Sequence, residues 1–194
     1  MPSPLAHTTA GYAVYRLLRR RRSDWEPQVW RLPLILLVTL VFSILPDFDA
    51  VAGILAGDIG RYHNQGTHSL VVGLLVALLF AVLLARGRMH AFKAWFPPLL
   101  LSYELHVLMD VVTLGERGVM LLWPLSSARF DVPFTLFYGV RWSEGIFAWQ
   151  HLVTLATEAL FALLVLGGLY LLERRQNVPS GPSQRRPLSE AEVD

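Results

Sequence analysis

Four long apolar runs constrain the fold of this chain more than any other feature. They cover residues 30–45, 68–85, 95–113 and 152–172. A helix that spans a bilayer needs about 20 mostly apolar residues, and the last three runs come close to that length. The first run reaches it only if its helix starts near Val29, and residues 5–18 form a shorter fifth candidate. We therefore expect an all-α, polytopic membrane bundle of about five helices.

Composition supports a membrane protein and narrows the possible chemistry. The chain is 54% hydrophobic and has a mean hydropathy of +0.44, which is too apolar for an ordinary soluble domain. The net charge of +2 gives no reason to expect nucleic acid as a partner. Cysteine is absent, so a metal site must use imidazole and carboxylate ligands, which suit Zn, Mn, Fe or Mg.

The placement of Lys and Arg predicts the orientation of the chain in its membrane. Basic residues cluster at 16–31, at 86–93 and at 174–175, and these regions alternate correctly to share the cytoplasmic side. The loops at 47–67 and 114–150 then face outward. With five spans the N-terminus also faces outward, together with His7, whereas four spans would leave His7 in the cytoplasm.

Residues 1–175 are predicted to form one membrane-embedded domain. The second outward loop is rich in aromatic residues, which favours a cap in the headgroup layer over a disordered segment. The tail at 176–194 is rich in Pro, Ser and charge, and we expect it to be disordered and cytoplasmic.

Three pairs of His and Asp stand where an apolar run begins or ends. They are Asp47 and Asp49 in LPDFD, His63 and His68 in HNQGTHS, and His106 and Asp110 in HVLMD. Ionisable groups are costly in or beside lipid, so their presence there predicts a functional site. The spacing of four between His106 and Asp110 puts both on one helix face, where they can grip one metal ion.

Each pair also has a purely structural interpretation. His106 and Asp110 can form a buried His–Asp hydrogen bond that only helps to hold the helices together. Asp47 and Asp49 can cap backbone N–H groups in a turn that follows Pro46. His63 and His68 can be two exposed histidines of the loop. Thr67 is a suitable N-cap for the helix that follows, which would put His68 in its first turn. For any one pair alone, both interpretations stay open.

The three pairs together argue for a shared site. The predicted topology puts all of them on the outward face, and His7 joins them if residues 5–18 span. The expected ligands are His7, Asp47, Asp49, His63, His68, His106 and Asp110. They suffice for one divalent ion, with Zn favoured, or for two ions that share a carboxylate. Two-metal sites favour phosphoester hydrolysis.

Further polar residues are candidates for supporting roles. Arg is well suited to bidentate phosphate binding, so Arg61, Arg117, Arg129 and Arg141 in the outward loops are candidate substrate-binding residues. Snorkelling towards lipid headgroups is the alternative for each of them. His151 and Glu158 share a face of the last helix and are candidates to orient ligand imidazoles, with plain interhelical hydrogen bonding as the alternative.

The chain resembles the YdjM-like family of inner-membrane metal-dependent hydrolases. The resemblance rests on HTTAG at 7–11, LPDFD, a His followed by THS, HVLMD and a downstream WPLS, and it covers about residues 7–126. It implies a bacterial membrane enzyme in which the seven His and Asp residues named above are metal ligands. The chain departs from the family pattern at Asn64, where the family has Arg, and this shifts interest to Arg61.

The leading hypothesis is therefore a metal-dependent hydrolase that acts on a phospholipid or a lipid-linked phosphoester at the outer membrane–water interface. Asp47, Asp49 and His68 are its expected catalytic residues, with Asp49 accepting the proton of the attacking water. A non-catalytic metal-binding membrane protein or a transporter is the alternative. The apolar inward halves of the helices argue against transport.

Overall fold

A computed structural model describes residues 2–22, 30, 33–57, 63–114, 118–140 and 148–176. Two short strands, β1 (Thr113–Leu114) and β2 (Phe137–Tyr138), pair in parallel. The rest of the regular structure is helical, which confirms the predicted helical class. It comprises α1 (Pro4–Arg22), α3 (Pro33–Phe42), the 3-10 helix η1 (Leu45–Phe48), α4 (Asp49–Leu55), α5 (Leu70–Ala85), α6 (Met89–Val111) and α7 (Gln150–Gln176).

Helix α5 begins two residues later than its apolar run. Its N-cap is Ser69, whose hydroxyl accepts hydrogen bonds from the backbone N–H groups of Val71 and Val72. The prediction that Thr67 caps this helix was therefore wrong. Because the cap falls after His68, that histidine lies in the preceding loop instead of in the first helical turn.

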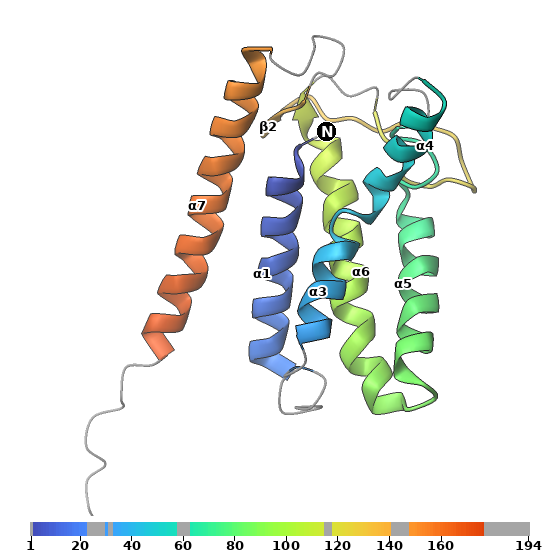
Figure 1. Cartoon of the computed structure of the whole chain (residues 1–194), viewed down its shortest axis with the longest axis vertical. Helices are drawn as coiled ribbons and strands as arrows, with labels where there is room; N and C mark the ends of the chain where they lie inside the picture. The colour runs from blue at the N-terminus through green and yellow to red at the C-terminus, as the bar shows by residue number, and fades with distance from the viewer. Residues whose placement is uncertain are drawn as a thin grey trace, which may run out of the picture.

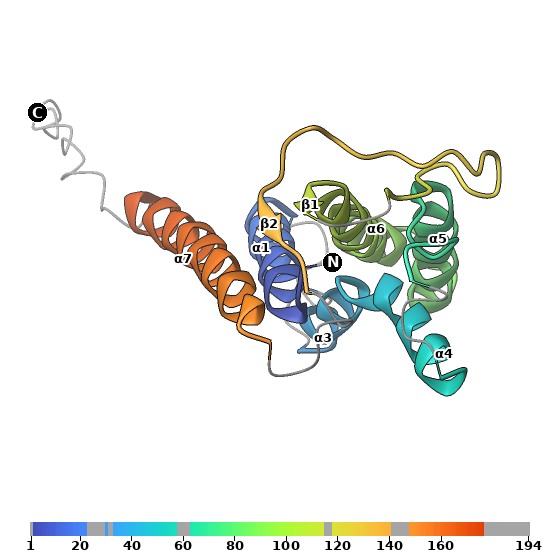
Figure 2. The same ribbon diagram turned by 90° about the horizontal axis from the view of Figure 1, so that it is seen from above.

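Helix α6 is the centre of the bundle. It packs against α1, α3 and α5, whereas α7 packs on α1 and β2 and leans away from the other helices (Figures 1 and 2). The close approach of α5 depends on a face of small buried residues that recur every four positions. A side chain at Gly73 on this face would place its Cβ 2.5 Å from Oε1 of Glu104 on α6. The buried members of this face are Gly73, Ala77, Ala81 and Ala85.

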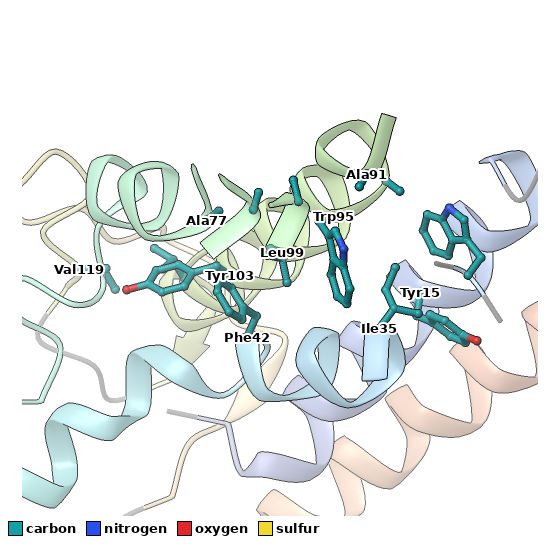
Figure 3. Packing of buried hydrophobic residues seen from close by; sticks show 14 residues of the cluster. Tyr15, Ile35, Phe42, Ala77, Ala91, Trp95, Leu99, Tyr103 and Val119 are labelled. Carbon is teal, nitrogen blue, oxygen red and sulfur yellow. The ribbon is translucent and has the colours of Figure 1, made fainter. Parts of the chain in front are cut away.

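The apolar core lies between α3 and α6. Figure 3 shows Trp95 and Leu99 of α6 directed towards Ile35 and Phe42 of α3, and all four side chains are buried. Tyr103 stands one turn above Leu99 on the same helix, and its hydroxyl donates to the backbone carbonyl of Thr67 at 2.6 Å. The core thus ties α6 to the loop that carries His68.

By length and composition, one helix among the described residues is suited to cross a bilayer by itself, namely Gln150–Arg175 in α7. The pair Pro33–Phe42 and Leu45–Leu55 passes the same test jointly but is bent by 62° at its break. Helix α5 is apolar but shorter. Five helices do coincide with the five predicted runs, and their role as five membrane spans stays a prediction.

The two ends of the bundle are formed by different elements. The N-terminus of α1, the η1–α4 segment and the two strands lie at one end, and the last turns of α1 and α7 lie at the other (Figure 1). The α5–α6 turn also lies at this second end, with Arg86 and Arg88 as its cap residues. Of the predicted tail, Gln176 ends α7, and 177–194 lie outside the described residues.

Candidate metal centre

Four of the seven expected ligands converge at the end of the bundle that carries η1. Asp47 comes from η1, His68 from the residue before the Ser69 cap, and His106 and Asp110 from the last turns of α6. The i,i+4 spacing on α6 aligns two donors on one face, as predicted. Among the described residues, this group offers one donor atom per side chain, and all four atoms lie within 4.8 Å of one another.

The distances within this four-donor group are nearly uniform. Nε2 of His68 lies 3.5 Å from Oδ1 of Asp47 and 3.1 Å from Oδ2 of Asp110. Nε2 of His106 lies 3.5 and 3.4 Å from the same two oxygens and 3.4 Å from Nε2 of His68. A tetrahedral zinc site with bonds of about 2.0–2.1 Å has donor–donor edges of roughly 3.4 Å. These five of the six donor–donor edges are therefore close to those of a tetrahedral ion, and the sixth is no longer than 4.8 Å.

The proton positions also favour a cation at this point. Nδ1 of His106 lies 2.8 Å from the carbonyl oxygen of Ser43 and must donate its proton there, so the neutral imidazole that binds a metal has its Nε2 lone pair facing the group. Both carboxylate oxygens of Asp47 and of Asp110 are buried without a hydrogen-bond partner among the described residues. Buried acceptors that face one another are costly unless a cation lies between them. The residues present fit a divalent metal ion.

His7 lines the same group from α1. Its ring stacks on His106 with centroids 3.7 Å apart, and its Nε2 lies 3.6 Å from Oδ1 of Asp110. Helix α1 can come this close because residue 11 is glycine: a Cβ there would lie 2.6 Å from Cβ of Ser43. His7 therefore adjoins the four-donor group without belonging to it.

Asp49 and His63 form a second group, which shares His68 with the first. Oδ1 of Asp49 lies 3.1 Å from Nδ1 of His63, and its Oδ2 lies 3.2 Å from Nδ1 of His68. The hydroxyl of Thr67 donates to the same Oδ2 at 2.7 Å. All seven expected ligands thus lie at one end of the bundle, six of them in two groups that share His68, and His7 beside the first group.

Neighbouring groups stabilise the charged forms of Asp49 and His68. Burial opposes ionisation of Asp49, but His63 and His68 stabilise the carboxylate and lower its pKa to about 2. Burial also opposes protonation of His68, but Asp110, Asp47 and Asp49 raise its pKa well above the ordinary value. Without a metal, positive charge on imidazole balances the carboxylates.

The remaining predicted residues lie elsewhere. Arg61, Arg117 and Arg141 fall outside the described residues. Nη1 of Arg129 donates to the carbonyls of Asn64 and Gly118, so this side chain joins the loop of Asn64 to the loop that follows β1. Glu158 is fully buried and accepts hydrogen bonds from the backbone N–H and the hydroxyl of Ser3. Neither ligand group includes His151 or Glu158.

Two supporting groups were not anticipated from the sequence. The carbonyl of Ser43 orients His106, and a backbone carbonyl carries no side-chain signature that could have revealed it. The hydroxyl of Thr67 supports Asp49, and here a signal was present, because Thr67 directly precedes His68 in THS.

The chain is similar to inner membrane proteins. The chain is 35% identical over 106 residues to the inner membrane protein YbcI of Escherichia coli (strain K12), a stretch that covers 53% of this chain and 60% of that relative. The chain thus spans less than two thirds of the length of this relative. No solved structure matches the chain. The family model described as YdjM inner membrane protein matches residues 1–176, so the chain belongs to the YdjM family of inner membrane proteins.

Proposed function

We propose that this protein is a membrane-embedded, metal-dependent hydrolase that acts on a phospholipid or a lipid-linked phosphoester. The observation that carries the proposal is the four-donor group of Asp47, His68, His106 and Asp110. Its near-tetrahedral edges and its unpaired buried oxygens make it a ready-formed cation site. Two imidazoles and two carboxylates with this geometry favour Zn²⁺.

A bound divalent ion would supply Lewis acidity, lower the pKa of a water molecule and stabilise negative charge on phosphoryl oxygens. The protein itself arranges the four donors and leaves one side from which substrate would approach them. Among the four donors, the side chain of Asp47 is 12% exposed, whereas those of His68, His106 and Asp110 are fully buried. Substrate would therefore reach the site from the side of Asp47 and η1.

The surface next to Asp47 suits a lipid. Phe48 is 55% exposed next to Asp47, and Leu55 at the end of α4 is 84% exposed. Val51 and Ile54 add further exposed apolar surface on the same short helix. Exposed apolar patches of this kind mark ligand or membrane contacts. Arg129 adds a positive charge beside the loop of Asn64, which favours an anionic headgroup.

The five-span topology is part of the same proposal. Helices α1, α3, α5, α6 and α7 would cross the inner membrane, with the α5–α6 turn and the C-terminus in the cytoplasm. The basic residues at that end support this orientation through the positive-inside rule. The metal centre would then face outward at headgroup depth, with the aromatic 114–150 loop beside it.

The experiment is a chelator-dependent activity screen. The full chain, purified in lipid nanodiscs, is incubated with phosphatidylglycerol, phosphatidylethanolamine, an isoprenyl diphosphate and the soluble probe bis(4-nitrophenyl) phosphate. We expect turnover of at least one lipid, loss of turnover with a chelator, and recovery when Zn²⁺ is restored. His106→Ala should be inactive. His90→Ala is the matched control, because His90 is an exposed residue at the opposite end of α6.

Failure on every substrate, or turnover that survives both chelation and His106→Ala, would overturn the hydrolase proposal. Zinc binding without any turnover would favour the alternative, a non-catalytic metal-binding membrane protein. One observation supports that alternative. The four-donor group supplies a full tetrahedral shell from the protein alone, which is typical of structural zinc sites, whereas catalytic sites keep a position open.

A further inference from the structure

We infer that the seven His and Asp residues divide into one cation site and one positioning chain, with Asp49 acting through His68 instead of binding metal. This inference rests on the metal-binding part of the proposed function. It assigns Asp49 a role different from the ligand and proton acceptor expected from the sequence. The carrying observation is that His68 faces the two groups with its two different ring nitrogens.

The two groups compete for one imidazole. Nε2 of His68 is directed at Asp47, Asp110 and His106, whereas its Nδ1 lies 3.2 Å from Asp49 and 3.1 Å from the hydroxyl of Thr67. A neutral imidazole has one lone pair and one N–H. His68 can therefore ligate a cation through one nitrogen only, and the two groups cannot both be ordinary histidine–metal sites.

The surroundings of each group decide which nitrogen is the ligand. The Asp49 group has the pattern of a hydrogen-bonded carboxylate, because its two oxygens face different partners. Oδ1 faces Nδ1 of His63, and Oδ2 receives the Thr67 hydroxyl together with Nδ1 of His68. The four-donor group has the opposite pattern, with unpaired oxygens and lone pairs at its centre. Because the Thr67 hydroxyl gives its own proton to Asp49, its oxygen can only accept from Nδ1 of His68, so the neutral ring carries its proton on Nδ1 and its lone pair on Nε2.

His68 and His106 are then held in the same way by different partners. Each directs its Nδ1 away from the centre, His106 to the Ser43 carbonyl, and His68 to the Thr67 hydroxyl at 3.1 Å and the Asp49 carboxylate at 3.2 Å. A carboxylate partner fixes the ring tautomer and raises the basicity of the ligand nitrogen more than a carbonyl does. Asp49 is a positioning residue that strengthens the bond from His68 to the cation.

The test measures metal stoichiometry and affinity, not turnover. The full chain in nanodiscs is loaded with Zn²⁺, and bound zinc is counted by elemental analysis and titrated against a chelating dye. We expect one zinc ion per chain in the wild type and in Asp49→Asn, with affinity weakened about 10- to 100-fold in the variant. His68→Ala should abolish tight binding. Asp131→Asn, an exposed carboxylate in the outward loop, is the matched control and should bind like the wild type.

Cobalt provides a readout that a general loss of packing would not produce. With Co²⁺ in place of zinc, Asp49→Asn should shift the visible absorption bands while keeping the intensity of a four-coordinate ion, because only the basicity of His68 changes. If Asp49→Asn does not give folded protein, Thr67→Val removes one hydrogen bond to Asp49 and should weaken zinc binding about 5-fold.

Two outcomes would overturn the inference while leaving the hydrolase proposal intact. One is two zinc ions per wild-type chain that fall to one in Asp49→Asn, which would make Asp49 a ligand of a second ion. The other is unchanged affinity and an unchanged cobalt spectrum in that variant. One zinc ion per chain without hydrolysis would instead overturn the hydrolase and leave the inference standing, and absence of metal from the wild type would overturn both.

Discussion

Helices α6 and α7 are both long, but they differ in what surrounds them. Helix α6 packs against α1, α3 and α5, and it supplies His106 and Asp110 to the four-donor group. Helix α7 packs on α1 and β2 and leaves most of its apolar side chains exposed. The helix that composition identifies as a membrane span is therefore not the helix that carries the site.

The difference follows from how polar groups survive in an apolar setting. Buried ionisable side chains need partners inside the bundle, and those of α6 find them in His7 of α1, Asp47 of η1 and His68 in the loop before α5. The polar residues that α7 buries are Thr154 and Glu158, and Glu158 binds Ser3 at the start of α1. Helix α7 therefore presents exposed apolar side chains, whereas α6 carries the buried ionisable residues His106 and Asp110.

The largest effect on zinc binding is expected when one donor is removed from α6. Asp110→Ala deletes one of the four donors and leaves the two imidazoles with one carboxylate, so we expect zinc affinity to fall by at least about 100-fold. Leu163→Ala in α7 is the control, because Leu163 is 71% exposed and should leave zinc affinity unchanged. Competition with a chelating dye measures both. Tight binding by Asp110→Ala would show that α6 does not carry the site.

The sequence predicted the helices better than the internal arrangement of the site. Hydrophobic runs located five helices, and the four-residue spacing of His106 and Asp110 correctly put both side chains on one face of α6. The split between Asp47 and Asp49 was not predictable from spacing. It depends on where η1 ends and α4 begins, and on which nitrogen of His68 each carboxylate meets. Those contacts arise from tertiary packing.

An intermediate effect is expected where α1 approaches α3. A Cβ at Gly11 would lie 2.6 Å from Cβ of Ser43, so Gly11→Ala must displace α1 or the Ser43 carbonyl that orients His106. Overpacking of this kind costs about 1–3 kcal/mol of unfolding free energy. We expect a lower melting temperature and weaker zinc binding than in the wild type.

A matched glycine in α7 serves as the control for Gly11→Ala. A Cβ at Gly168 would meet no atom within 4 Å, so Gly168→Ala should be neutral or slightly stabilising through helix propensity. Thermal unfolding followed by tryptophan fluorescence, with and without Zn²⁺, measures both variants. Equal melting temperatures for the two variants would show that the α1–Ser43 contact does not constrain the site.

The smallest effect on metal binding is expected at the link between α7 and α1. Glu158→Ala leaves the N–H of Ser3 without its buried partner, which costs about 1–3 kcal/mol. Amide exchange in the first turn of α1 should rise. Zinc affinity should change less than about 10-fold, because His7 on that helix adjoins the four donors without belonging to them.

Glu173→Ala is the control for this link, because Glu173 joins α7 to α1 through Arg16 at the opposite end of the bundle. That ion pair is partly exposed, and such pairs contribute about 0–1 kcal/mol. Hydrogen exchange read by mass spectrometry distinguishes the two variants: faster exchange at residues 4–8 is expected for Glu158→Ala and not for Glu173→Ala. A collapse of zinc binding in Glu158→Ala would mean that α7, through the start of α1, helps to hold the metal, and the division of roles between α6 and α7 would be lost.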